Sequence, residues 1–474
     1  MLSIKLMCSS RRNFLPPDFW LMTSRFEMES FITTVVEEEQ KRHEALEEDE
    51  SEAKDAITST HQRHRFLSTI APRLELLQNL PFFIPFDTRV QIFRAFVQLD
   101  KSRQQIGEDF FGFDYSKLHA NIRRETVFED AFEAFHTLGR RFKRPLSITF
   151  YNENGQEAGI DGGGLTKELI TSLCRQAFDA NYALFKETSN NLVYPNPDNY
   201  AKQQAQLQAF EFLGLVIGKC FYEGILIDIA FAPFFLLNWV GGYRTSINDL
   251  RDLDEELYQG LNNLKDYKGD VESDLSLNFT ISDEDYGAVK SVELRIDGSN
   301  TPVTNLNRLE YIHEVARYRL ETKIAPQVAA FLRGLSQMIE SHWFSMFNQS
   351  ELQTVIGGAP IPIDVVDLKR NTSLAGYQEN DPIISNFWQV LNDYSDDNRR
   401  KLIKFVTSVS RPPLLGFREL KPSFALQRAG EDETRLPTAS TCVNLLKLPP
   451  YSTKEILWQK LTYAINSEAG FDLS

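Results

Sequence analysis

The chain contains few cysteines and no uninterrupted apolar run of membrane-spanning length. A spanning helix needs roughly 20 apolar residues, and the most apolar stretch, ILIDIAFAPFFLLNWVGG, is interrupted by Asp228 and Pro233, so we interpret it as buried helices. No two cysteines have Cys-x-x-Cys spacing, which argues against a disulfide framework and a zinc ribbon. Cys174 and Cys220 lie among apolar residues and are interpreted as buried small hydrophobic side chains. The four cysteines are Cys8, Cys174, Cys220 and Cys442.

Basic residues are outnumbered by acidic ones, with 51 Lys and Arg against 66 Asp and Glu and a formal net charge of −15. A protein that binds nucleic acid or an anionic membrane needs a basic surface, so we expect neither partner. The first residues also lack the apolar core and the small-residue cleavage site of a secretion signal. Together with the few cysteines, this predicts a cytoplasmic or nuclear protein in a reducing compartment.

The length of 474 residues allows two or three domains with sizeable cores. An acidic segment without Gly or Pro, VVEEEQKRHEALEEDESEAKDA, predicts a solvated helix before residue 60. Helical patterns dominate the middle of the chain, where Pro326 is expected to kink or divide a long helix. A polar stretch, NTSLAGYQENDP, then predicts a domain boundary with a hinge between Gly376 and Asn380.

The segment LSITFYNENGQEAGIDGGGLTKELI predicts a strand, a turn, a glycine-rich loop and a helix. This order resembles that of a phosphate-binding loop. Gly159 and Gly164 have the separation of the Walker pattern, but Leu165 and Thr166 stand where Lys and Ser or Thr are required. Because no lysine is present there to neutralise phosphate, the pattern favours a tight structural turn, and we expect no nucleotide or other cofactor.

Cys442 belongs to a segment with α+β character, in which SFALQ and CVNLLKL predict two strands. Pro449 and Pro450 are expected to end the second strand. Ser452 and Glu455 have the spacing of a capping box and predict the start of a final helix. The thiol is therefore expected at the point where a loop enters a strand.

The residues alone allow three interpretations of this thiol: an inert cysteine of a non-catalytic scaffold, a cysteine hydrolase nucleophile, and an acyl carrier. A hydrolase nucleophile needs a histidine base within hydrogen-bonding reach, and no histidine follows His342, which excludes a local pair. An acyl carrier needs less, because a small thiolate fraction is already nucleophilic at neutral pH. The residues by themselves do not separate the carrier from the inert core cysteine.

The segment LPTASTCVNLLKLPPY resembles the active-site segment of HECT-type ubiquitin ligases. AGIDGGGLTKE, FEFLGLVIGKCFYEGILIDIAFAPFF, SRPPLLGFREL and the tail GFDLS resemble further segments of that family, in the same order. The resemblance extends over about 135–474. YPNP, LNFT, PVTNLNRLEYIHEVARYRL and RLPTASTC are most similar to the branch known as ubiquitin-protein ligase E3 type C.

The resemblance implies a bilobed α+β fold. A mainly helical N-lobe is expected at 135–376, a flexible hinge at 377–380, and a smaller α/β C-lobe at 381–474. Helices at 60–134 are expected to brace the catalytic domain, after an irregular and acidic helical extension at 1–59.

The resemblance also implies a ubiquitin ligase that uses no metal and no cofactor. Cys442 matches the position that takes ubiquitin as a thioester and passes it to a lysine amine, and Thr441 is expected to shape the loop. Phe471 matches an aromatic residue associated with transfer onto lysine, and Asp472 is a candidate for deprotonating that lysine. Many family members have histidine before the Thr-Cys pair, where this chain has Ser440, so the sequence does not support a histidine-assisted mechanism.

The partners implied by the resemblance are a ubiquitin-conjugating enzyme, ubiquitin, substrate proteins and the proteasome. A groove for the conjugating enzyme is expected at about 228–285. The candidate contact residues are Val240, Tyr258, Leu261 and Phe279, and a plain core role is an equal alternative for each of them.

Overall fold

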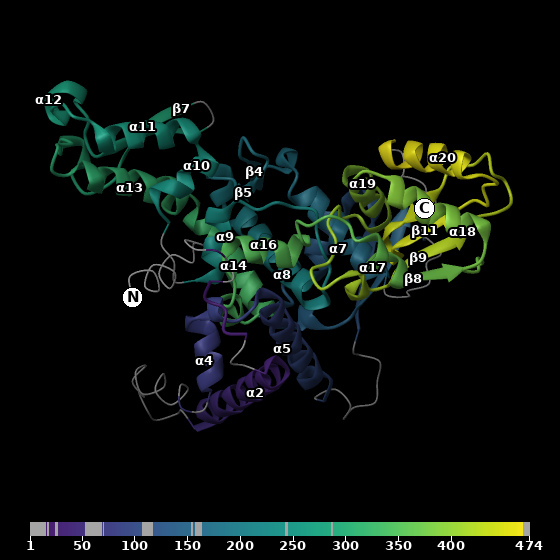
Figure 1. Cartoon of the computed structure of the whole chain (residues 1–474). Helices are drawn as coiled ribbons and strands as arrows, with labels where there is room; N and C mark the ends of the chain where they lie inside the picture. The colour runs from purple at the N-terminus through teal and green to yellow at the C-terminus, as the bar shows by residue number, and fades with distance from the viewer. Residues whose placement is uncertain are drawn as a thin grey trace. The chain divides into compact units, whose positions relative to one another are not determined.

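The computed structural model describes residues 16, 19–23, 27–52, 69, 71–106, 117–152, 155–156, 164–241, 245–285 and 288–467 (Figure 1). Helices predominate and the strands form small sheets, which confirms the predicted α+β class. The chain divides into two compact units. The first contains residues up to 114, 183–214 and 231–352, and the second contains 115–182, 215–230 and 353–474. No helix in these described stretches combines the length and the apolar character needed to cross a membrane.

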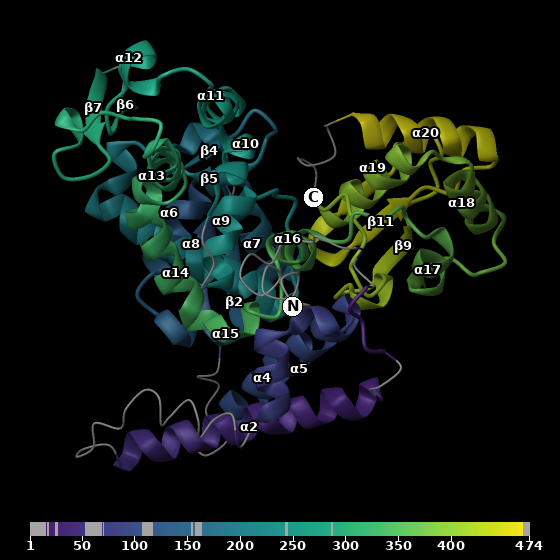
Figure 2. The ribbon, with the colours of Figure 1, turned by 60° about the vertical axis from the view of Figure 1, so that its left-hand side comes forward.

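Three helices come first in the first unit: α2 (Met28–Glu52), α4 (Pro72–Asn79) and α5 (Phe86–Ile106). The long helix α2 lies against both α4 and α5 (Figure 2). Apolar residues three and four positions apart give α5 one buried face, as expected for an amphipathic helix. The buried residues of that face include Val90, Ile92, Phe93, Phe96 and Val97.

The remaining elements of the first unit include two helices that are joined by aromatic side chains. They are β4 (Phe185–Glu187), β5 (Val193–Pro195), α9 (Pro233–Val240), α10 (Leu250–Leu253), α11 (Glu255–Asp266), α12 (Val271–Leu275), β6 (Thr280–Asp285), β7 (Ala288–Glu293), α13 (Arg308–Leu320), α14 (Ala325–Met338) and α15 (Ser341–Phe344). The rings of Phe235 and Trp239 on α9 lie 5.3 and 5.1 Å from that of Phe331 on α14. Pro326 stands in the first turn of α14, so it divides the helical segment as predicted.

The second unit begins with β1 (Leu118–Arg123), which pairs in parallel with β2 (Leu146–Asn152). The segment LSITFYN forms β2 as predicted, and its alternating pattern buries Leu146, Ile148 and Phe150. Two cysteines on neighbouring helices, Cys174 and Cys220, are buried as expected. The other elements are α6 (Val127–Phe135), β3 (Gly155–Gln156), α7 (Gly164–Ala177), α8 (Gln204–Glu223) and α16 (Gln349–Gly357); α8 and α16 also extend into the first unit.

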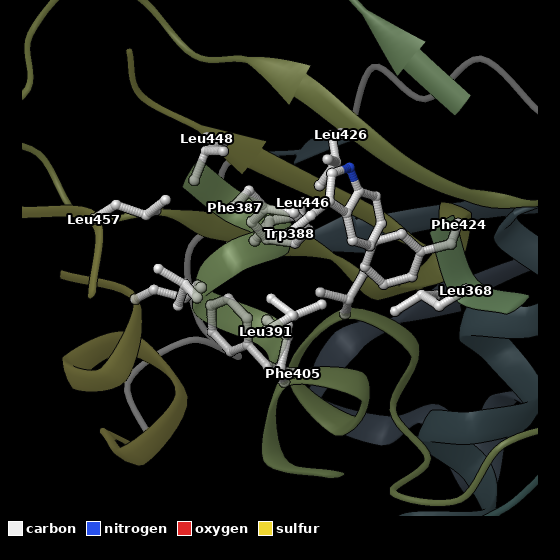
Figure 3. Close-up of a cluster of buried hydrophobic side chains, with 14 of the residues drawn as sticks. Leu368, Phe387, Trp388, Leu391, Phe405, Phe424, Leu426, Leu446, Leu448 and Leu457 are labelled. Carbon is white, nitrogen blue, oxygen red and sulfur yellow. The ribbon is translucent and has the colours of Figure 1, made fainter. Parts of the chain in front are cut away.

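A four-stranded sheet with the order β10-β11-β9-β8 lies in the last part of the second unit. Its strands are β8 (Thr372–Ala375), β9 (Phe424–Arg428), β10 (Thr438–Ser440) and β11 (Leu445–Leu448). The helices beside it are α17 (Val365–Arg370), α18 (Pro382–Asp393), α19 (Asp396–Thr407) and α20 (Lys454–Asn466) (Figure 2). Phe387 of α18, Phe405 of α19 and Leu446 of β11 belong to one buried cluster between them (Figure 3).

The core of this part includes residues that precede the predicted hinge at 377–380. Ile363 and Leu368 belong to the buried cluster, and β8 pairs in parallel with β9. Tyr377, inside the predicted hinge at 377–380, is buried, and its hydroxyl donates to the carbonyl of Leu448 at 2.7 Å. Packing therefore joins residues from 363 onward to the following helices; Tyr377 takes part in this packing, whereas 378–380 are exposed.

The predicted start of the last helix is shifted by one residue. Strand β11 ends at Leu448, directly before Pro449, as the two prolines predict. The side chain of Thr453 accepts a hydrogen bond from the amide of Ile456, so Thr453 caps α20 in place of the expected Ser452. The amide of Ser452 instead donates to a carboxylate oxygen of Glu433 at 3.0 Å.

Candidate functional site

Cys442 lies at the centre of a single 3-10 turn (Thr441–Val443) between β10 and β11. The sequence pattern had predicted a strand from the cysteine onward, but β11 begins only at Leu445. The difference arises at Asn444, which has a φ of 53° and so breaks the extended backbone. Asparagine tolerates this left-handed conformation better than most residues. The thiol is half-buried, so it is accessible while its backbone is fixed.

Asn444 connects the cysteine turn to the neighbouring strand. Its side chain donates to the carbonyl of Pro422 at 2.5 Å, and its own carbonyl accepts from the amide of Ala425 at 2.9 Å. Its amide donates to the carbonyl of Thr441 across the turn. With 1% of its surface exposed, Asn444 makes these bonds inside the protein, where leaving them unmade would be costly.

Helix α7 approaches the turn closely enough to bond to it. The ammonium of Lys167 donates to the carbonyl of Thr441 at 2.9 Å and to the side-chain oxygen of Asn444. Gly164, at the start of the helix, has no side chain, and a Cβ there would lie 2.8 Å from Cγ1 of Val443 and 3.1 Å from the carbonyl oxygen of Cys442. A larger residue would push the helix and the turn apart, so glycine is required for this contact.

The charges of α7 act on the thiol in opposite directions. Burial raises the pKa of Cys442 above its ordinary value and the carboxylate of Glu168 raises it further, whereas the ammonium of Lys167 lowers it. Burial also lowers the pKa of Lys167 from 10.5 to about 8, and Cys442 opposes that shift. Glu168 is held by Arg124 at 2.6 Å. At neutral pH the cysteine is therefore mostly the thiol, and its thiolate fraction depends on this balance.

No histidine is among the groups whose charges principally act on Cys442 in the described part of the chain. His136, which belongs to the same unit, stacks on Phe132 with ring centroids 4.2 Å apart, and its Nδ1 lies 2.7 Å from the carbonyl of Phe132. The groups that principally act on Cys442 in the described residues therefore include no base of the kind that a cysteine hydrolase uses.

The structure places only part of the predicted site. Cys442 and Thr441 are adjacent in the turn, and Thr441 contributes its backbone carbonyl. Phe471 and Asp472 lie outside the described residues. Lys167, Glu168 and Asn444 were missed by sequence reasoning. The sequence indicated them only as members of AGIDGGGLTKE and LPTASTCVNLLKLPPY. Neither motif shows that these two segments, which lie far apart in the chain, meet in the fold.

Three of the four predicted contact residues for a conjugating enzyme are core residues. Val240, Leu261 and Phe279 are 4%, 5% and 0% exposed, which is too little for a direct contact surface. Tyr258 is half-buried. Phe279 packs edge-on against Tyr311, with ring centroids 5.5 Å apart. Apolarity in the sequence did not distinguish a residue that fills the core from one that binds a partner.

Exposed apolar side chains do occur in the first unit, in the segment before α13 and in the first turn of that helix. Ile296 and Leu306 are each 97% exposed and Leu309 is 60% exposed. Arg295 forms an ion pair with Glu310 at 3.0 Å, which ties the segment of Ile296 to the first turn of α13. We call Ile296, Leu306 and Leu309 the exposed apolar group. Large apolar residues that are exposed together commonly mark an interaction surface, and the Arg295–Glu310 ion pair brings the segment of Ile296 to that of Leu309.

The described residues contain no group of three or more His, Cys, Asp or Glu side chains arranged to hold a metal ion. A profile of the HECT-domain (ubiquitin-transferase) family matches residues 171–474. The chain belongs to the HECT-domain family. The family assignment agrees with the resemblance of the motif that contains Cys442.

Several curated proteins are similar to this HECT chain. A probable E3 ubiquitin protein ligase of Schizosaccharomyces pombe is 47% identical over 468 residues, which is 98% of this chain and 44% of that protein. The E3 ubiquitin-protein ligase HUL5 of Saccharomyces cerevisiae is 45% identical over 85% of this chain and 45% of its own length. The ubiquitin-protein ligase E3B of Homo sapiens is 38% identical over 84% of this chain and 40% of its own length. The HECT chain thus spans less than half the length of these relatives.

Proposed function

We propose that this HECT chain is a ubiquitin ligase that carries ubiquitin as a thioester on Cys442 and transfers it to lysine amines of substrate proteins or of ubiquitin. The observation that carries the proposal is the half-buried thiol at the centre of a turn that is fixed from two sides. Family membership supports the same activity. The absence of a histidine among the charges that principally act on Cys442, in the described residues, favours a carrier over a hydrolase.

The chemistry consists of two acyl transfers. The Cys442 thiolate attacks the carbonyl carbon of the ubiquitin thioester on the conjugating enzyme; a new C–S bond forms, and the donor sulfur leaves as a thiolate. A lysine amine then attacks the new thioester; a C–N bond forms, the Cys442 sulfur leaves, and the amine loses a proton to solvent. Neither step needs a metal or a nucleotide on this chain, because the donor thioester already carries the activated acyl group.

A movable link between two lobes would serve these two steps, since the thiol must meet the conjugating enzyme first and the substrate afterwards. We propose this link at residues 360–362, which are exposed between the buried Ala359 and the start of the C-terminal core at Ile363. The lobes would then be 135–359 and 363–474, in place of the boundary expected at 377–380. The role of the helices before residue 134 in bracing the catalytic domain stays a proposal.

The conjugating enzyme is proposed to dock on the exposed apolar group instead of on the buried Val240, Leu261 and Phe279. Tyr258 stays a candidate because part of its side chain is accessible. Thr441 is proposed to shape the loop through its carbonyl. Phe471 is proposed to promote transfer to lysine, with Asp472 as a candidate acid–base group. We also propose that the ubiquitinated products go to the proteasome and that the protein is cytoplasmic or nuclear.

The direct test is to trap the intermediate. The protein is incubated with activating enzyme, conjugating enzyme and labelled ubiquitin, and the products are separated without reductant. We expect an adduct that reductant removes, a reductant-stable ester in Cys442→Ser, and no adduct in Cys442→Ala. Phe471→Ala is expected to form the thioester at the parent rate and to transfer ubiquitin to lysine more slowly.

Two results would contradict the proposal. Lack of a Cys442 adduct with every conjugating enzyme of a broad panel would support the non-catalytic scaffold. An adduct that water hydrolyses without any transfer to added amines would support a hydrolase. Equal loss of thioester and of lysine transfer in Phe471→Ala would contradict only the assigned role of Phe471.

A further inference from the structure

Lys167 is a buried cation whose described hydrogen-bond acceptors are neutral oxygens. It is 8% exposed, and its ammonium bonds to a backbone carbonyl and an amide oxygen on the cysteine turn. No carboxylate among the described residues forms an ion pair with it, and the charge that acts on it is that of Cys442. A buried charge without a counter-ion is costly. Its position beside a thiol therefore points to a role that requires the charge.

The lysine contacts both ends of the turn at once. The carbonyl of Thr441 precedes the cysteine and the side chain of Asn444 follows it, so both flanks of Cys442 are tied to α7. Asn444 is itself fixed to Pro422 and Ala425. One ammonium thus sets the position of the sulfur relative to α7.

Among the charged groups that principally act on Cys442, Lys167 is the cation, and it lowers the pKa of the thiol. Glu168 opposes it, and Arg124 holds Glu168 at 2.6 Å. Helix α19 also packs against the turn. The basic side chains of α19 that form ion pairs do so elsewhere: Arg400 with Asp396, Lys401 with Asp397 and Lys404 with Asp228.

We propose that Lys167 is a positioning residue for thioester exchange at Cys442: it ties both flanks of the cysteine to α7 and places a positive charge beside the sulfur. The role of this lysine in ubiquitin transfer rests on the proposed function. Its effect on the thiol does not, because thiol reactivity can be measured without any partner protein.

The positive charge of Lys167 makes its interaction with the cysteine turn depend on whether Cys442 is ionised. Before exchange, the ammonium attracts the developing thiolate. When the thiolate attacks the donor thioester, its negative charge leaves on the donor sulfur, and the new thioester on Cys442 is neutral. The attraction between Lys167 and residue 442 is therefore absent from the loaded thioester. Because the resting cysteine is mostly the neutral thiol, the charge acts on its small thiolate fraction and on the attacking sulfur.

The first experiment measures the rate at which iodoacetamide alkylates Cys442 between pH 6 and 10, followed by mass spectrometry of the Cys442 peptide. Only the thiolate reacts, so the pH profile reports its pKa. We expect Lys167→Met to slow alkylation on the order of tenfold at pH 7, because a missing neighbouring cation raises a thiol pKa by about one unit. The difference should shrink above pH 8, where the lysine itself loses its proton.

Two variants serve as controls. Lys167→Arg keeps the positive charge and is expected to retain the alkylation rate of the parent at pH 7, where Lys167 is also charged. Lys421→Met makes the same chemical change at an exposed lysine and is expected to leave the profile unchanged. Circular dichroism and thermal unfolding of each variant separate a local change from a loss of folding.

The second experiment repeats the comparison with single-turnover loading from charged conjugating enzyme. Superimposable alkylation profiles for Lys167→Met and the parent would overturn the proposal, and so would failure of a folded Lys167→Arg protein to keep the parent's alkylation rate at pH 7. A shifted alkylation profile together with no loading in the parent would instead refute the ligase activity and leave the effect on the thiol intact. A shifted profile and slower loading in Lys167→Met would support both.

Discussion

A single buried carboxylate, Glu39 of α2, connects two helices that lie far apart in the sequence. It accepts from the indole of Trp343 at 2.8 Å and from Arg42 at 3.0 Å, and it lies 3.1 Å from Nε2 of His342. Burial alone would raise the pKa of Glu39, but the hydrogen bond and charge of His342, with Arg42 and Trp343, lower it to about 2. The charged form is therefore the stable one in the folded protein.

Glu39→Gln is expected to destabilise the first unit by about 3 kcal/mol at pH 7, because the variant loses the favourable ionised state. A carboxylate whose folded pKa is lowered stabilises fully above its unfolded value of 4.5, and this contribution is lost as the pH falls toward 2. The measurement is chemical denaturation of both proteins from pH 3 to 8. The difference between them should narrow below pH 4.5, and a constant or absent difference would contradict this account.

At the scale of elements, the exposed apolar group joins the start of α13 to the segment before it. If this surface receives the conjugating enzyme, Leu306→Asp with Leu309→Asp should slow loading of Cys442 by about tenfold or more, because charge placed in an apolar contact surface is costly. The readout is single-turnover loading at several concentrations of charged conjugating enzyme. Alkylation of Cys442 should be unchanged.

A matched control is Val366→Asp, which changes an apolar residue of α17 that is 67% exposed in the second unit. It should load ubiquitin at the parent rate. Equal slowing by both sets of changes would argue against a specific docking surface on α13. Unchanged loading in the double variant would exclude the exposed apolar group as the site.

At the scale of the whole molecule, the start of the C-terminal core can be tested with two fragments. Residues 360–474 retain α17, β8 and the hydrogen bond from the amide of Ile363 to Asp396 at 2.8 Å. This fragment should unfold cooperatively on heating, because its buried cluster is self-contained. Residues 381–474 lack Leu368 and Tyr377, and they should unfold at a clearly lower temperature or without cooperativity. Equal stability of the two fragments, measured by circular dichroism, would restore the predicted boundary at 377–380.

The sequence was informative wherever a local pattern decides the structure. The alternation in LSITFYN predicted β2, Pro326 divided a helix, and the motif around Cys442 indicated the candidate thiol. It failed where a contact joins distant residues. Lys167 meets Thr441 across 274 positions, and Phe279 proved to be core, although nothing local distinguishes a core phenylalanine from a binding one. The polar composition around the predicted hinge likewise did not reveal that β8 pairs with β9.

The long separation between Lys167 and the cysteine turn has a consequence for protein synthesis. The ribosome makes α7 long before the turn, so Lys167 cannot bond to Thr441 until 274 further residues have been added. Contacts of such separation form late in folding, because they require the intervening chain to be ordered first. An interrupted or misfolded chain would therefore contain either no acceptor thiol or one whose flanks are unbound. If Cys442 carries ubiquitin as proposed, the placement of its thiol for thioester exchange thus depends on correct folding of the unit.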